Sequence, residues 1–194
     1  MEHRTPIETE IKLRLPDLQG LQSRLEALGF RLTVPAQAET SVLWDRKGEL
    51  REQGSALRLR RFDGRAWFTW KGPRLQDAAF KIRPELETEV SDPEALEGIL
   101  RALGFEPTMR MEKTRAVLRS PELVACLDQT PFGCFLELEG EPSAIRSAME
   151  ALGLGAEVPM RRIAGRIFGL YHAMDRGEQQ RVHEHAAWLA GHLD

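Results

Sequence analysis

The sequence of 194 residues predicts an α+β fold of about eight antiparallel strands with short helices packed against them. Two observations predict the strands: several segments alternate charged and apolar residues with a period of two, and short turns separate them. A third observation predicts the helices, because three segments repeat apolar residues at helical spacing and share one ending. The chain is long enough for one domain with a sizeable core.

The expected strands carry their charges on one face. In the segment 7–15 (IETEIKLRL) every second residue is charged, so the side chains between them form an opposite, mostly apolar face. Five further segments alternate in the same way: 57–60, 68–71, 80–90, 109–119 and 135–139. Two more strands are expected near 38–45 and 122–128. Hairpin-like turns are expected at Asp63-Gly64 and at 131–133.

The helices are expected in an internal repeat. Residues 21–30 (LQSRLEALGF) and 96–105 (LEGILRALGF) are identical at six of ten positions, and 145–154 (IRSAMEALGL) is a weaker copy. Each copy ends in Ala-Leu-Gly, and glycine is the usual stop of a helix. We expect Asp17 to cap the first helix and Asp92, which a proline follows, to cap the second. A Glu-x-Glu strand precedes each copy, which favours an internal duplication over a coincidental helix ending.

Composition excludes several classes of protein. Apolar residues make up 42% and charged residues 29% of the chain, which excludes a disordered chain and a membrane protein. Lys plus Arg is 27 and Asp plus Glu is 30, and this net charge of −3 argues against a general nucleic-acid binder. The first ten residues contain no apolar stretch, so no signal peptide is expected. Two cysteines fit a reducing cytosol, and we predict a cytoplasmic protein.

A charged strand face is commonly the solvated side of a sheet. Here the other face is strongly apolar, so the helices must cover it. Arginine is frequent on the charged face, and its guanidinium suits contacts with oxyanions. About eight strands can close into a barrel that holds one small ligand. The periodicity fits both an open sheet with one polar face and a closed barrel with a charged lumen.

Two pairs of carboxylates stand out on the charged faces. Glu8 projects together with Glu10, and Glu137 projects together with Glu139. Unpaired carboxylates packed close together would repel and raise each other's pKa, and a hard divalent cation such as Mg²⁺ or Mn²⁺ removes that conflict. Metal combined with many Arg and Lys residues around one cavity is what phosphoryl chemistry needs. The alternative is a set of internal salt bridges.

These residues also resemble a known family. The segment 8–12 (ETEIK) resembles the E-x-E-x-K signature of the CYTH superfamily, the triphosphate tunnel metalloenzymes. Further matching segments follow in the family's order: LRLR at 57–60, TWKGP at 69–73, RPELE at 83–87, KTR at 113–115, the turn at Asp128 and ELE at 137–139. The resemblance implies an eight-stranded antiparallel closed β-barrel, the triphosphate tunnel, with helices packed outside. We expect this domain over 1–171 and a C-terminal helical tail over 172–194.

The resemblance also implies roles for the charged residues. The acidic residues expected to hold Mg²⁺ or Mn²⁺ are Glu8, Glu10, Asp128, Glu137 and Glu139. The basic residues expected to bind the triphosphate are Lys12, Arg58, Arg60, Lys71, Arg83 and Arg115. Among these two sets, the residues expected to be catalytic are Glu10, Lys12 and Lys71. Further residues expected to line the tunnel are Glu85, Glu87 and Lys113.

Two departures from the family pattern bear on the reaction. Relatives often carry a tyrosine before an aromatic residue and an aspartate, and some hydrolases are proposed to use it to activate water; here Leu43 precedes Trp44 and Asp45. The terminal basic ligand could be Arg161, Arg162 or Arg166, with Tyr171 as a shifted equivalent of the family's C-terminal tyrosine.

The first expected function is metal-dependent hydrolysis of inorganic tripolyphosphate or of a nucleoside or thiamine triphosphate. One alternative is a class IV adenylyl cyclase that converts ATP to cyclic AMP and pyrophosphate. Another is a non-catalytic polyphosphate- or nucleotide-binding module. The expected partner is a small-molecule triphosphate, with no nucleic acid and no membrane, and the protein is expected to be a monomer or a homodimer.

Overall fold

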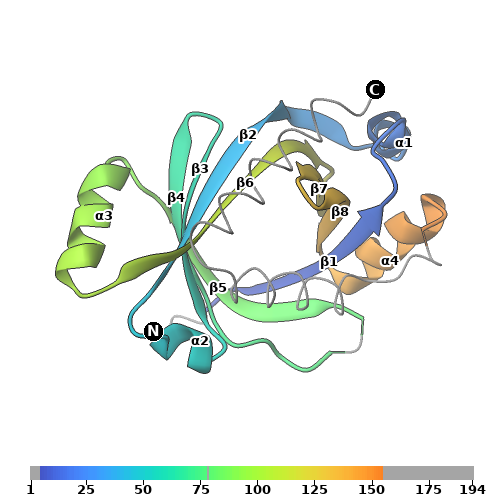
Figure 1. Cartoon of the computed structure of the whole chain (residues 1–194). Helices are drawn as coiled ribbons and strands as arrows, with labels where there is room; N and C mark the ends of the chain where they lie inside the picture. The colour runs from blue at the N-terminus through green and yellow to red at the C-terminus, as the bar shows by residue number, and fades with distance from the viewer. Residues whose placement is uncertain (1–4, 78, 155–194) are drawn as a thin grey trace.

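The computed structural model describes residues 5–77 and 79–154, and within them eight strands close into one barrel (Figure 1). The strands are β1 (Ile7–Leu15), β2 (Arg31–Asp45), β3 (Ala56–Phe62), β4 (Arg65–Lys71), β5 (Lys81–Glu89), β6 (Glu106–Arg119), β7 (Leu123–Thr130) and β8 (Gly133–Gly140). Their order around the barrel is β1-β5-β4-β3-β2-β6-β7-β8, and every neighbouring pair is antiparallel. The predicted fold class, an eight-stranded antiparallel closed barrel with external helices, is therefore confirmed.

Helices cover the apolar outer face of the barrel on two sides. They are α1 (Leu21–Ala27), α2 (Glu49–Glu52), α3 (Pro93–Ala102) and α4 (Pro142–Ala151). Figure 1 shows α3 on one side of the barrel, with α1 and α4 on the other. Leu25 of α1 and Ile145 of α4 are buried in one core with Leu13 and Leu138 of the barrel, and Leu100 of α3 is buried in a second. Burial of this face turns the charged face inward.

The ends of the helices follow the expected repeat with one exception. Gly29, Gly104 and Gly153 all have positive φ, and the next residue donates its N–H back into the last helical turn. Asp92 caps α3 by accepting a hydrogen bond of 2.8 Å from the N–H of Ala95, as predicted. The prediction for Asp17 is wrong. Its carboxylate accepts a hydrogen bond from the N–H of Gln19 in the turn before the helix. The N-cap residue of α1 is Gly20, with φ 69°.

The barrel order is consistent with an internal duplication. If β1 to β4 are exchanged with β5 to β8, the order of neighbours around the barrel is unchanged. The exchange places α1, which joins β1 to β2, on α3, which joins β5 to β6. These two helices are the ones whose sequences match most closely.

The structure describes the two cysteines, whereas several other candidate residues lie outside the described part of the chain. Cys126 and Cys134 are both free thiols; Cys126 is buried and Cys134 is half-buried. In the described part of the chain, no helix has the length and apolar character needed to cross a membrane. The candidate residues Arg161, Arg162, Arg166 and Tyr171, and the tail expected over 172–194, lie outside the described residues.

Candidate active site in the barrel lumen

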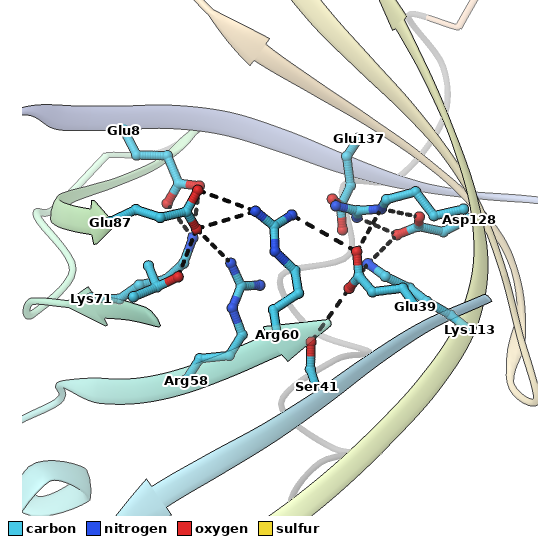
Figure 2. A network of polar contacts seen from close by, with 12 residues as sticks. Glu8, Glu39, Ser41, Arg58, Arg60, Lys71, Glu87, Lys113, Asp128 and Glu137 are labelled. Carbon is cyan, nitrogen blue, oxygen red and sulfur yellow. Dashed lines mark hydrogen bonds and ion pairs between the residues drawn. The ribbon is translucent and has the colours of Figure 1, made fainter. Parts of the chain in front are cut away.

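Closure of the barrel brings the charged strand faces together in its lumen. All fourteen residues expected at the site lie on inward-facing positions of seven strands: Glu8, Glu10, Lys12, Arg58, Arg60, Lys71, Arg83, Glu85, Glu87, Lys113, Arg115, Asp128, Glu137 and Glu139. Figure 2 shows a network of polar contacts in the lumen, with Arg60 between Glu87 on one side and Glu39 on the other. The period-two alternation produces this arrangement, because only one face of each strand can meet the lumen.

Asp128 anchors the basic residues of β6. Its side chain has no exposed surface, and its two oxygens accept hydrogen bonds of 2.6 Å each from Arg115. Lys113 donates to the same carboxylate at 2.8 Å. The ammonium of Lys12 lies 3.7 Å from it. Three cations therefore surround Asp128, which leaves it little capacity as a metal ligand.

Glu137 joins Lys12 and Arg115 into the same network. Lys12 donates to Glu137 at 2.5 Å, and Arg115 donates to its other oxygen. Burial alone would raise the pKa of Glu137, but the positive charges of Arg115, Lys12 and Lys113 hold it well below its usual value. The same pairing raises the pKa of Lys12 despite its burial, chiefly through Glu137. Both groups are thus held in their charged forms.

Glu39 of β2 belongs to the site and was missed by the sequence analysis. It is 2% exposed and lies 3.3 Å from Lys113, 3.6 Å from Arg115 and 3.8 Å from Arg60. Burial opposes its ionisation, yet the surrounding cations, Arg115 first, lower its pKa. Glu39 does alternate with the inward-facing Ser41. The available signal was weak, because register shifts in β2 interrupt the alternation before this point.

The carboxylates of β1 are paired with lysines of β4 and β5. Lys71 donates to both oxygens of Glu8 at 2.7 and 2.8 Å and lies 2.5 Å from Glu85. Lys81 donates to Glu10. Lys81 belongs to the charged face of the alternating segment 80–90 but is not among the residues expected at the site. Its register position opposite Glu10 places it in the lumen. The alternative of internal salt bridges therefore accounts for many lumen contacts.

Arg83 is used differently from the other basic residues. It is 7% exposed and donates to the backbone carbonyls of Gly72 and Lys71 at 3.1 Å each. Burial lowers its pKa, although Glu8 opposes that effect. Its guanidinium therefore fixes the end of β4 where the loop to β5 begins.

Arg58 and Arg60 keep unused hydrogen-bonding capacity in the lumen. Arg60 donates to both oxygens of Glu87 at 3.1 and 3.2 Å, and Arg58 lies 3.6 Å from the same carboxylate. Thr69 also donates to Glu87 at 2.6 Å. The Nε atoms of both arginines are buried without a hydrogen-bond partner. Burial and the neighbouring Arg58 lower the pKa of Arg60. These donors point to an anionic ligand, because buried polar groups are normally satisfied.

Glu139 is the remaining inward carboxylate of β8. It stands opposite Glu10 in the strand register. The residue as a whole is exposed, but the protein around its carboxylate and the negative charges of Glu8 and Glu10 raise its pKa. Burial also raises the pKa of Glu8, despite Lys71. In the described residues no three acidic, histidine or cysteine side chains are gathered in a metal-holding arrangement. Even so, the mutual repulsion of these three carboxylates suits a divalent cation.

The charges between the two ends of the lumen balance. The acidic residues are Glu8, Glu10, Glu39, Glu85, Glu87, Asp128, Glu137 and Glu139. The basic residues are Lys12, Arg58, Arg60, Lys71, Lys81, Arg83, Lys113 and Arg115. Eight charges of each sign give a neutral lumen in the described part of the chain. A polyanion bound there would bring an excess of negative charge unless cations accompanied it.

Asp45 lies outside this network. It belongs to the segment Leu43-Trp44-Asp45, in which this sequence departs from the family pattern. Its carboxylate accepts hydrogen bonds from the N–H groups of Arg46, Leu50 and Arg51 at 2.7, 3.0 and 3.1 Å. Asp45 therefore holds the start of α2. Trp44 is 2% exposed and packs in the outer core under α3.

The fold and the lumen together define a class of protein: a closed antiparallel barrel with a tunnel of paired acidic and basic side chains. Residues 6–152 match the CYTH domain, and the chain belongs to the CYTH family. Members of this family act on triphosphate substrates and are in general metal-dependent.

Three relatives illustrate the similarity. A Methanocaldococcus jannaschii protein named "Putative adenylate cyclase MJ0240" is 32% identical over 147 residues, which are 75% of this chain and 83% of that protein. The PH1012 protein of Pyrococcus horikoshii shares the fold with a TM-score of 0.64 at 24% identity, covering 77% of this chain and 92% of that one. HpAC1 from Hippeastrum, described with a dominant triphosphatase activity, has a TM-score of 0.56 at 25% identity, covering 75% and 85%.

Proposed function

We propose that this protein hydrolyses a triphosphate substrate in the barrel lumen with the help of a divalent metal ion. The substrate would be inorganic tripolyphosphate or a nucleoside or thiamine triphosphate. The observation that carries the proposal is the pair of buried Nε–H donors of Arg58 and Arg60, which face the lumen without a partner. A phosphate oxygen would satisfy them with charge-assisted hydrogen bonds.

The neutral lumen supports a role for metal in binding. A triphosphate carries several negative charges, and the lumen cations are already offset by carboxylates. The donors that fit Mg²⁺ or Mn²⁺ are Glu8, Glu10 and Glu139. Burial raises the pKa of Glu8, and burial together with the charges of Glu8 and Glu10 raises the pKa of Glu139. Such an ion would neutralise phosphate oxygens and polarise the phosphorus. Asp128 and Glu137 would instead position Arg115, Lys113 and Lys12.

The basic residues supply the rest of the charge stabilisation. Lys12 and Lys71 would exchange part of their contacts with Glu137 and Glu8 for phosphate oxygens as the substrate enters. Arg58 and Arg60 of β3, the strand next to that of Lys71, would bind through their free Nε–H groups. Catalysis would then depend on positioning and on the stabilisation of negative charge in the transition state.

Product analysis tests the proposal. The protein would be incubated with Mg²⁺ or Mn²⁺ and, separately, with tripolyphosphate, ATP and thiamine triphosphate, and the products separated as phosphate, pyrophosphate and cyclic AMP. We expect release of phosphate. Cyclic AMP with pyrophosphate would instead support the class IV cyclase alternative, in line with the adenylate cyclase name of the M. jannaschii relative. Binding without turnover of any substrate would favour a sensor. A cytoplasmic location stays a prediction from the two free cysteines.

A further inference from the structure

An apolar cluster interrupts the charged lumen at one end. Its central members are Phe62 of β3, Val117 of β6 and Cys126 of β7, which are 5%, 7% and 9% exposed. Trp67 of β4 packs against them. Val34 of β2 and Val124 of β7 complete the cluster. The members on β3, β4, β6 and β7 follow the inward alternation of their strands, since Arg60, Thr69, Arg115 and Asp128 lie on the same faces, and Val34 stands opposite Val117 in the register of β2 and β6. We call these six residues the apolar bridge.

The bridge crosses the lumen from wall to wall. In the barrel order, β4 and β7 are four steps apart among eight strands, so they face each other across the lumen. Trp67 of β4 and Cys126 of β7 belong to the same packed cluster. Phe62 and Val117, of strands that lie between β4 and β7 on one side of the barrel, belong to the same cluster. The bridge therefore lines five consecutive strands of the eight at this end with apolar side chains.

The three remaining strands present carboxylates at that end. In the register, Glu139 of β8 stands opposite Val124, and Glu89 of β5 stands opposite Trp67. This end of the barrel carries the β3–β4 turn at Asp63-Gly64 and the end of β6. An anion leaving by this end would meet apolar side chains, at a large desolvation cost, or the carboxylate of Glu89.

The other end of the lumen carries exposed positive charge in the described part of the chain. It carries the loop from β4 to β5 and the turn from β7 to β8. Lys12 and Lys81, the most exposed of the ion-paired lumen cations at 29% and 27%, lie in the halves of β1 and β5 nearest to it. Exposed positive charge at this mouth would attract a polyphosphate.

We propose that the apolar bridge closes the lumen at the β3–β4 end, so that the protein binds linear phosphate chains only by a free terminal phosphate. This inference rests on the proposed binding of triphosphates in the lumen. The chain enters past Lys12 and Lys81, and its first phosphate stops at Arg60, whose guanidinium lies 4.9 Å from the centre of the Trp67 ring. Any organic group or further phosphate trails out of the open mouth.

The stoichiometry of binding to long polyphosphate tests the closure. A linear polyphosphate chain has two ends. If the lumen is closed at one end, each chain therefore binds at most two protein molecules, whatever its length. A through-going tunnel would thread, and the number of molecules would rise with chain length. The measurement is sedimentation velocity with graded linear polyphosphates, with Ca²⁺ as the divalent ion and chain integrity checked by gel afterwards.

Variants make the test specific. Phe62→Ala combined with Val117→Ala should open the lumen and let the number of bound molecules grow with chain length. Phe68→Ala, which removes an aromatic ring from the outer face of β4, should keep the limit of two. If the double variant does not fold, Trp67→Ala serves in its place, and circular dichroism checks each protein.

The outcomes separate this inference from the proposed function. Tripolyphosphate is titrated in parallel and should bind one per protein. If tripolyphosphate binds but the wild-type protein loads long chains in proportion to their length, and tripolyphosphate displaces that binding, the closure is wrong. If tripolyphosphate does not bind, the proposed function fails and the closure falls with it.

Discussion

Asp128 on β7 stands directly opposite Arg115 on β6, and two hydrogen bonds of 2.6 Å join their side chains inside the barrel. Arg115 is also paired with Glu137 and lies 3.6 Å from Glu39. Burial opposes the charge of Arg115, but Glu137 and Asp128 raise its pKa well above the ordinary value. The guanidinium is therefore permanently charged and fixed in orientation before any ligand arrives, as a preorganised anion site requires.

Asp128→Asn should destabilise the fold. The change leaves Arg115 and Lys113 with one fewer counter-ion in a buried site, and breaking such a pair costs about 3 kcal/mol. Urea unfolding followed by tryptophan fluorescence measures the loss. Glu112→Gln breaks the exposed pair with Arg110 and should cost about 0.5 kcal/mol or less. Equal losses in the two variants would show that Asp128 is not a structural anchor.

Arg58→Ala should weaken the use of any triphosphate. Loss of charge-assisted hydrogen bonds should raise KM and lower kcat, reducing kcat/KM by about 10- to 100-fold. The matched control is Arg61→Ala, three residues along the same strand. Arg61 lies on the outer face and pairs with Glu94 and Glu97 of α3, so steady-state kinetics should barely change. If only nucleotide substrates were affected, Arg58 would contact the base instead.

Glu10→Ala and Glu139→Ala should each abolish turnover while leaving the barrel folded. Both carboxylates are proposed metal ligands, and each side chain lies at the lumen rather than in a hydrophobic core. Turnover at increasing Mn²⁺ concentrations, together with a direct Mn²⁺ titration, measures the effect. Normal activity in either variant would remove that residue from the metal site. Glu122→Ala, in the exposed β6–β7 turn, serves as the control.

The pH dependence of the stability of the Glu139→Gln variant, measured without added metal, should reveal the repulsion of Glu139 by Glu8 and Glu10. The protein around its carboxylate and the charges of Glu8 and Glu10 raise the pKa of Glu139 in the folded state, so its ionised form destabilises the fold. The variant should therefore be more stable than the wild type near pH 7. The difference should vanish as the pH falls below the unfolded-state pKa of glutamate, where the carboxyl is protonated in both states. Thermal unfolding across this range checks it, and a constant difference would contradict the repulsion.

Cys126 should resist alkylation in the native protein. It is buried in the apolar bridge, and burial raises the pKa of its thiol to about 12, so little thiolate exists at neutral pH. Cys134 is only half-buried and should react faster. Mass spectrometry after timed iodoacetamide labelling, with and without denaturant, measures both rates. Equal native rates would mean that the bridge opens readily.

Much of this architecture could be predicted from local patterns. The alternation in IETEIKLRL assigns Glu8, Glu10 and Lys12 to one face, and that face is the lumen. The repeated Ala-Leu-Gly ending predicts where α1, α3 and α4 stop, because a glycine tolerates the positive φ found there. Capping by Asp17 was predicted incorrectly because a cap depends on where the helix starts, and Gly20 moved that start.

The sequence by itself determined which side chains face inward on the strands other than β2, and the family to which the chain belongs, since both follow from alternation and from the order of short motifs. Only the tertiary structure decided which of these side chains meet. Glu39 meets Arg115, Lys81 meets Glu10, and Trp67 joins Cys126 in one cluster across the lumen. Such pairs are set by the register and closure of strands far apart in the chain, and a period-two pattern carries no information about either.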